Sequence, residues 1–139
     1  MVYMSFDIRQ PDEEFRLSQD LLFRKAKCTD FFIQNNSFNL PAGDDHFLIK
    51  INDWNDNVHL FPSSIGNTES TQYFVSIPYS VGVPVSYHPV DMTRPDYESK
   101  SMLKAERHIR VTLRKGDGTL IDASEFGAGT SCHMIIHFE

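Results

Sequence analysis

The chain has 139 residues and a formal net charge of −6, and 40% of its residues are hydrophobic and 23% charged. This length is typical of one domain, and the composition can bury a hydrophobic core, which excludes a disordered chain. Proteins that bind nucleic acid through many phosphates are normally basic, so the acidic balance disfavours that partner. We therefore expect a single domain over residues 1–139.

Short apolar segments separated by turn residues recur along the chain, a pattern typical of all-β sandwiches and barrels. Alternation of apolar and polar residues predicts strands in the first part of the chain at 2–8, 21–28, 30–34, 46–51, 58–61 and 72–77. Clusters of turn-forming residues lie between them at 10–12, 35–37, 41–45, 52–57 and 62–67.

Residues 78–95 contain four of the seven prolines. Val83, Val85 and Tyr87 suit an edge strand, where a missing backbone N–H is tolerated. The remainder of this stretch is expected to run over the surface. The only helix that the sequence suggests lies over 96–105. We expect it to be short, because its apolar residues make no convincing stripe along one face.

The C-terminal third carries the clearest strand signals. Residues 107–114 form a strand with Ile109, Val111 and Leu113 facing inward. A glycine-containing turn at 115–118 predicts a hairpin with a return strand at 119–123. After a turn at 127–130, a closing strand at 132–138 has Cys132, Met134, Ile136 and Phe138 on one face. Together these patterns predict an antiparallel β-sandwich of about eight to ten strands, of jelly-roll or Greek-key type.

The C-terminal pattern also resembles a known group of proteins. An alternating strand, an Asp-Gly hairpin and a Leu-Ile-Asp return at 109–122 are followed by the apolar strand at 132–138. This order is similar to the ends of short β-rich proteins of Polinton-like transposons and related double-stranded DNA viruses. Because such elements carry jelly-roll capsid proteins, the resemblance implies a minor capsid or penton-like component. It implies no catalytic residues.

No motif indicates catalysis, a metal or a cofactor. On one strand His133 and His137 would lie about 13 Å apart, too far to share an ion. The Asp- and Asn-rich run 53–57 lacks the glycine and glutamate of a calcium loop, and neither glycine-rich turn has phosphate-loop spacing. Cys28 and Cys132 are expected to be buried, reduced thiols rather than a disulfide. We therefore predict no enzymatic activity.

The sequence is best explained as a structural or assembly protein, such as a viral minor capsid component that forms homo-oligomers or larger assemblies. Residues 1–14 and 78–95 are the expected contact segments. The individual contact candidates are Pro78, Pro84, Tyr87, Pro89 and Trp54. The alternative is a lectin-like or other ligand-binding module, in which Trp54, Tyr87 and the loop 52–57 form the site. A small metal-dependent barrel enzyme is a third option, but the His-x-His motif that it needs is missing.

Two expectations concern charge and location. Arg110, Arg114 and Lys115 could form one basic patch for an acidic partner. The sequence contains no apolar run of membrane-spanning length, and its start has no basic segment followed by an apolar one. We therefore expect the protein in a virion or inside cells, not in a membrane.

Overall fold

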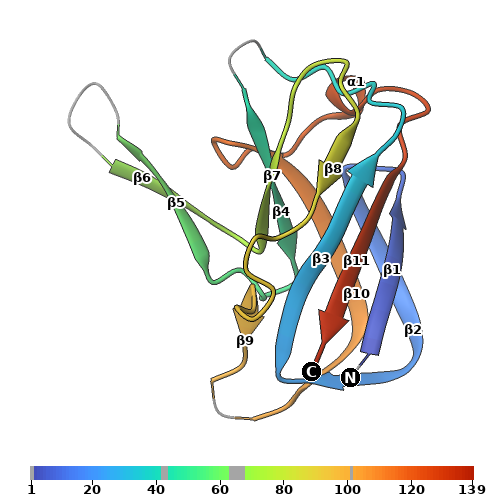
Figure 1. The fold of residues 1–139 in the computed structure, drawn as a ribbon, viewed down its shortest axis with the longest axis vertical. Coiled ribbons are helices and arrows are strands. Elements are labelled where there is room, and N and C mark those ends of the chain that lie inside the picture. Colours follow the sequence, from blue (N-terminus) through green and yellow to red (C-terminus); the bar gives the residue numbers. More distant parts are fainter. Residues whose placement is uncertain (1, 42–43, 63–67, 101) are drawn as a thin grey trace.

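The computed structural model describes residues 2–41, 44–62, 68–100 and 102–139, which form eleven strands and one short helix. Two antiparallel sheets lie face to face (Figure 1). Sheet A has the strand order β1 (Val2–Ile8), β11 (Cys132–Phe138), β3 (Lys25–Ile33) and β8 (Val85–Tyr87), and β9 (Tyr97–Glu98) also pairs with β3. Sheet B has the strand order β2 (Asp12–Phe23), β10 (Lys104–Lys115), β4 (His46–Ile51) and β7 (Val75–Pro78).

The strands pair in a nested order, from the two ends of the chain toward its middle. β1 pairs with β11, β2 with β10, β3 with β8 and β9, and β4 with β7, all antiparallel. A separate hairpin of β5 (Asn57–Pro62) and β6 (Thr68–Tyr73) lies innermost and projects from the side of the sandwich (Figure 1). Apart from the short β9, the two sheets contain eight strands, and eight strands wound in this order form a jelly roll. The predicted all-β antiparallel sandwich is therefore confirmed.

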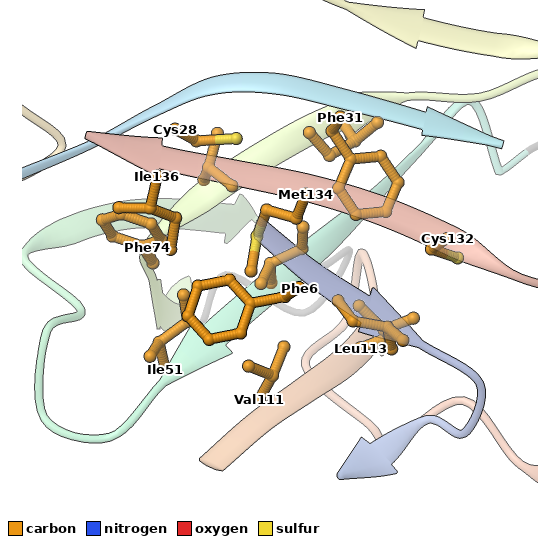
Figure 2. Close-up of a cluster of buried hydrophobic side chains, with 14 of the residues drawn as sticks. Phe6, Cys28, Phe31, Ile51, Phe74, Val111, Leu113, Cys132, Met134 and Ile136 are labelled. Atoms are coloured by element: carbon orange, nitrogen blue, oxygen red, sulfur yellow. The ribbon is translucent and has the colours of Figure 1, made fainter. Parts of the chain in front are cut away.

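The core lies between the two sheets and is built by strand alternation. Ile109, Val111 and Leu113 face inward from β10 as predicted, and all three are fully buried. The four residues predicted on one face of β11 are buried as well. Figure 2 shows three of them, Cys132, Met134 and Ile136, on the same side of the core as Phe6 and Phe31 of sheet A, opposite Ile51, Val111 and Leu113 of sheet B.

Two local predictions were wrong. The segment 96–105 contains no helix among its described residues; it holds β9 and the start of β10, and residue 101 lies outside the described part. The predicted return strand 119–123 forms one isolated bridge, Arg114 to Leu120, before helix α1 (Ala123–Phe126) begins. The helix starts there because Asp122 accepts from the Glu125 N–H at 2.8 Å while Glu125 Oε1 accepts from the Asp122 N–H at 3.1 Å.

Strand boundaries also differ from the prediction. β2 begins at Asp12, the last residue of the predicted turn 10–12, and the predicted strand 72–77 is divided at Phe74 into β6 and β7. Leu48 points outward by alternation, on the same face as His46, yet it is fully buried. On that face His46 stacks on His59 of β5, with 5.0 Å between ring centroids. Most of the predicted loop 62–67, and residues 42–43 of the turn 41–45, lie outside the described residues.

Candidate functional site

The jelly roll has two lateral sides, where the edge strands of the sheets face each other. On one side β1 of sheet A faces β2 of sheet B, and on the other β8 and β9 face β7. Each side contains a hollow. The structure therefore offers two candidate sites, which we call the edge groove and the tyrosine cleft.

The tyrosine cleft has a volume of about 440 Å³. Two aromatic rings line it, Tyr73 at the end of β6 and Tyr87 at the end of β8. Lys27 of β3, Asn57 of β5 and Asp96 supply polar groups. Val75 and Ser76 of β7 and the loop 88–95 complete the wall, the loop with His88, Pro89, Val90, Asp91, Arg94 and Pro95.

The cleft lies where the edge of sheet A is interrupted. β8 pairs with residues 31–33 of β3, and β9 pairs with residues 25–26, which leaves a gap between them. Asp96 occupies the gap: its carboxylate accepts from the Cys28 N–H at 2.8 Å, and its own N–H donates to the Ala26 carbonyl at 2.9 Å. Between β8 and β9, the Asp96 side chain thus makes the hydrogen bond that a neighbouring strand would otherwise make to β3, and this part of the edge of sheet A lines the cleft.

Burial controls the electrostatics of the cleft. Only 8% of Lys27 is exposed, and its Nζ donates to the backbone carbonyl of Arg94. Burial raises the pKa of Asp96 above its ordinary value. Burial, helped by the charge of Asp96, raises the pKa of Tyr87 to about 12. The cleft therefore presents two aromatic rings and the hydroxyl group of Tyr87 beside the buried Lys27 and the half-buried Asp96.

The edge groove has a volume of about 320 Å³ and is lined by Val2 and Met4 of β1 and by residues 17–22 of β2. In β2, residues 17–20 stand opposite the single residue Arg107 of β10, because Arg16 pairs with His108 and Leu21 with Glu106. At this bulge the regular pairing of β2 with β10 is interrupted, and bulges of this kind bend the strand that contains the extra residues. β1 has no register shift in its pairing with β11.

The predicted contact residues separate into three places. Tyr87 and Pro89 line the tyrosine cleft. Pro78 ends β7 and Pro84 precedes β8, and both are exposed. Trp54 contradicts the prediction, because it is fully buried, and it cannot contact a partner or stack on a sugar.

The predicted basic patch is also only partly correct. Arg110 and Arg114 lie on the outer face of sheet B, where they line a hollow together with Lys50. Lys115 is one residue further along β10 and therefore points to the opposite face. Its Nζ contacts Glu125 Oε2 at 3.0 Å.

Both cysteines are buried free thiols. Cys28 stands opposite Ile136 and Cys132 opposite Ile33, so they are separated along the strands and do not form a disulfide (Figure 2). Burial raises the pKa of each thiol. In the described part of the chain, no three His, Cys, Asp or Glu side chains come close enough together to hold a metal ion.

Sequence reasoning missed Lys27, Tyr73 and Asp96. Lys27 sits in an apolar strand, and only the interruption between β8 and β9 exposes it to a cleft. The Pro-Asp pair at 95–96 was a usable signal, since proline fixes its own backbone φ angle and aspartate side chains accept hydrogen bonds from nearby backbone N–H groups.

No protein-family model, curated protein or solved structure matches this chain. The helix among the described residues has four residues, and none there is long and apolar enough to cross a membrane.

Proposed function

We propose that this protein is a non-enzymatic assembly subunit, a capsid-like building block of a virion or virus-like particle, that binds a second copy of itself. The observation that carries the proposal is the open edge of β1, with exposed apolar side chains beside it. The jelly-roll strand order supports it, since capsid domains use this architecture, although lectins and cupins do too.

The edge of β1 is suited to pairing with another strand. Among the described residues β1 pairs with β11 alone, so its other side presents free backbone N–H and C=O groups. Val2 is 45% exposed and Tyr3 63%. Residues 2–6 contain no charge, and Asp7 already contacts His133 Nδ1 at 2.5 Å. Charge, proline and bulges normally protect such edges, and β1 uses none of them between residues 2 and 6.

The favoured occupant is a second β1 strand. Two identical strands can pair antiparallel across a twofold axis, which makes one edge complementary to itself. Because residues 2–6 are uncharged, this pairing brings no like charges together. The edge groove beside β1, with Val2, Met4, Leu17 and Leu22, would bury partner side chains. Leu22 is 61% exposed without such a partner.

The variant Ser5→Lys tests this interface. Ser5 is exposed on β1, and a lysine there would place two positive charges close together in a β1–β1 pair. We expect light scattering after size exclusion to give dimers or larger species for the parent protein. For Ser5→Lys we expect a dissociation constant raised about tenfold or more, with mainly the 16.0 kDa monomer present.

Ser86→Lys is the matched control, because Ser86 is also an exposed serine on an edge strand of sheet A, β8. It should assemble like the parent. Electron microscopy of the assembled peak would show whether rings or closed particles form. A monomeric parent at high concentration, or equal assembly of both lysine variants, would refute the proposal.

The tyrosine cleft favours a second candidate function, the binding of a carbohydrate or a similar polyhydroxy ligand. Its volume lies within the usual range of small-molecule sites. Tyr73 and Tyr87 offer rings for stacking, while Asn57, Lys27 and Asp96 offer donors and acceptors. This site overlaps only partly with the predicted lectin site: Trp54 is buried, whereas Tyr87 and Asn57, the last residue of the predicted loop 52–57, line the cleft.

A glycan array followed by calorimetry tests the second function. Tyr73→Ala and Tyr87→Ala should each weaken binding of a positive glycan about tenfold, by loss of ring stacking. Tyr3→Ala, which removes an exposed tyrosine on β1, should leave it unchanged. Circular dichroism checks that each variant is folded. An array without hits, or equal binding by all variants, would exclude this function.

A further inference from the structure

The outer face of sheet B contains a hollow of about 290 Å³ lined by Lys50, Asn52, Arg110, Thr112 and Arg114. Arg110, Thr112 and Arg114 alternate with the buried residues of β10 and therefore face outward together. Lys50 of β4 stands directly opposite Thr112. The two arginines are thus its diagonal neighbours on the same face, within reach of long side chains.

Positive charge in this hollow is only partly compensated. Arg110 is held by Asp12, through Nε at 2.9 Å and Nη2 at 2.6 Å. Arg114 donates to two neutral acceptors, the Thr112 hydroxyl at 3.2 Å and the Gly118 carbonyl at 3.0 Å. Among the described residues, Lys50 has no acid within ion-pair distance. Three cations therefore line the hollow and only Arg110 among them is ion-paired within the described residues, on a protein whose overall net charge is −6.

The arrangement of the hollow is costly without a ligand. Like charges on neighbouring strands repel each other and destabilise the sheet. Consistent with this, burial and the charge of Arg114 lower the pKa of Lys50. Thr112 is only 6% exposed, so its hydroxyl is fixed at the base of the hollow.

We propose that this hollow binds one phosphate group, free or as part of a small phosphomonoester, through Lys50, Arg110 and Arg114. Guanidinium and ammonium groups form short, strong hydrogen bonds to phosphate oxygens, and Nη1 of Arg110 and Nη2 of Arg114 have no described acceptor. The Thr112 hydroxyl can donate a further bond, since it accepts from Arg114.

The surroundings favour an isolated phosphate over a nucleic-acid backbone. Asp12 and Glu14 border the hollow on β2, and Asp117 lines the adjoining hollow that shares Lys50. Asp117 Oδ1 accepts from Thr119 N at 3.0 Å and from Thr119 Oγ1 at 2.6 Å. A continuous row of phosphates would therefore meet acids on two sides of the three cations.

Thermal unfolding with inorganic phosphate tests the site, with sodium chloride at the same ionic strength as reference. We expect phosphate to raise the melting temperature of the parent beyond the chloride reference, because a ligand of the folded state stabilises it. Lys50→Gln and Arg114→Gln should each weaken phosphate binding about tenfold by calorimetry. The matched control Lys100→Gln removes an exposed lysine elsewhere and should bind like the parent.

A second measurement separates lost binding from lost folding. Without phosphate, Lys50→Gln should melt no lower than the parent, since it removes a repulsive charge. A sugar phosphate in place of inorganic phosphate would identify a monoester as the better source if it binds more tightly. The inference is overturned if phosphate acts no differently from chloride, or if the Lys50 and Lys100 variants bind equally. It is also overturned if a single-stranded oligonucleotide binds more tightly than either phosphate compound. Its affinity would then fall with rising salt as steeply as expected for contacts to several phosphates.

Discussion

Replacing Trp54 with alanine should lower the free energy of unfolding by about 3–5 kcal/mol, the usual cost of removing a large buried aromatic side chain. Trp54 is fully buried, and its ring centroid lies 4.8 Å from that of Phe23 and 5.8 Å from that of Phe138. Its Nε1 donates to Glu106 Oε1 at 3.1 Å. Urea unfolding of the parent and the variant measures the difference.

Two variants refine this measurement. Trp54→Phe retains most of the aromatic volume and loses the bond to Glu106, so it should cost less than the alanine variant. Leu60→Ala changes a residue that is 61% exposed on β5 and should remain within about 0.5 kcal/mol of the parent. Trp54 is the only tryptophan, so its fluorescence reports this site alone. Red-shifted, easily quenched emission, together with a small stability loss, would contradict a buried Trp54.

Gly127→Ala should lower the free energy of unfolding by about 2–5 kcal/mol, from backbone strain and a steric clash. Gly127 ends helix α1 with φ of +84°, a conformation that L-residues rarely adopt. A Cβ at this position would lie 2.2 Å from the carbonyl oxygen of Ser37. That contact cannot be relieved by a side-chain rotation, because the neighbour is backbone. Thermal or urea unfolding again provides the measurement.

Gly129→Ala is the matched control for this second result. Gly129 also has a positive φ, +80°, but an added Cβ would have no atom within 4 Å. Its cost should therefore be limited to the backbone term, about 1–2 kcal/mol. The difference between the two variants isolates the close approach of Ser37 to Gly127. Equal losses would mean that these two segments do not pack in solution as they do here.

The sequence was most informative where strands alternate regularly around the core. β1, β4, β10 and β11 were each predicted to within a few residues, because their apolar residues repeat every second position. The first half of β2 was missed because its charged residues look like a solvated loop. Asp12 is in fact an ion-pair partner of Arg110, and Asp20 of Arg107, on a strand about ninety residues later. Sequence spacing cannot reveal such distant pairing.

Local polarity misled the prediction for Trp54. The residue lies among Asn and Asp in the stretch 52–57, which predicted an exposed turn. The turn is present, but its amides bond within the protein: Asn52 Oδ1 accepts from the Arg110 N–H at 2.8 Å, and Asn55 Oδ1 from the Ile51 N–H at 3.0 Å. With its polar groups satisfied internally, the turn can place a tryptophan in the core.

Helix α1 was not predicted, although the sequence carries a local signal for it. Asp122 and Glu125 have the spacing of a capping box, a start signal that can be read from sequence alone. The candidate sites were harder to predict. Tyr73 and Tyr87 meet Lys27 only because the nested topology brings the ends of β6 and β8 to the interrupted edge of β3.

The nested pairing of the strands also constrains the order in which the protein can fold. β5 with β6 and β4 with β7 join residues near in sequence, whereas Val2 pairs with Phe138 across almost the whole chain. Long-range pairing closes large loops at high entropic cost, so it is slow and usually late. β11 lies between β1 and β3, so β1 has no neighbour until β11 has docked. The edge that we propose for assembly would then be the last to form, and incompletely folded chains would not present it.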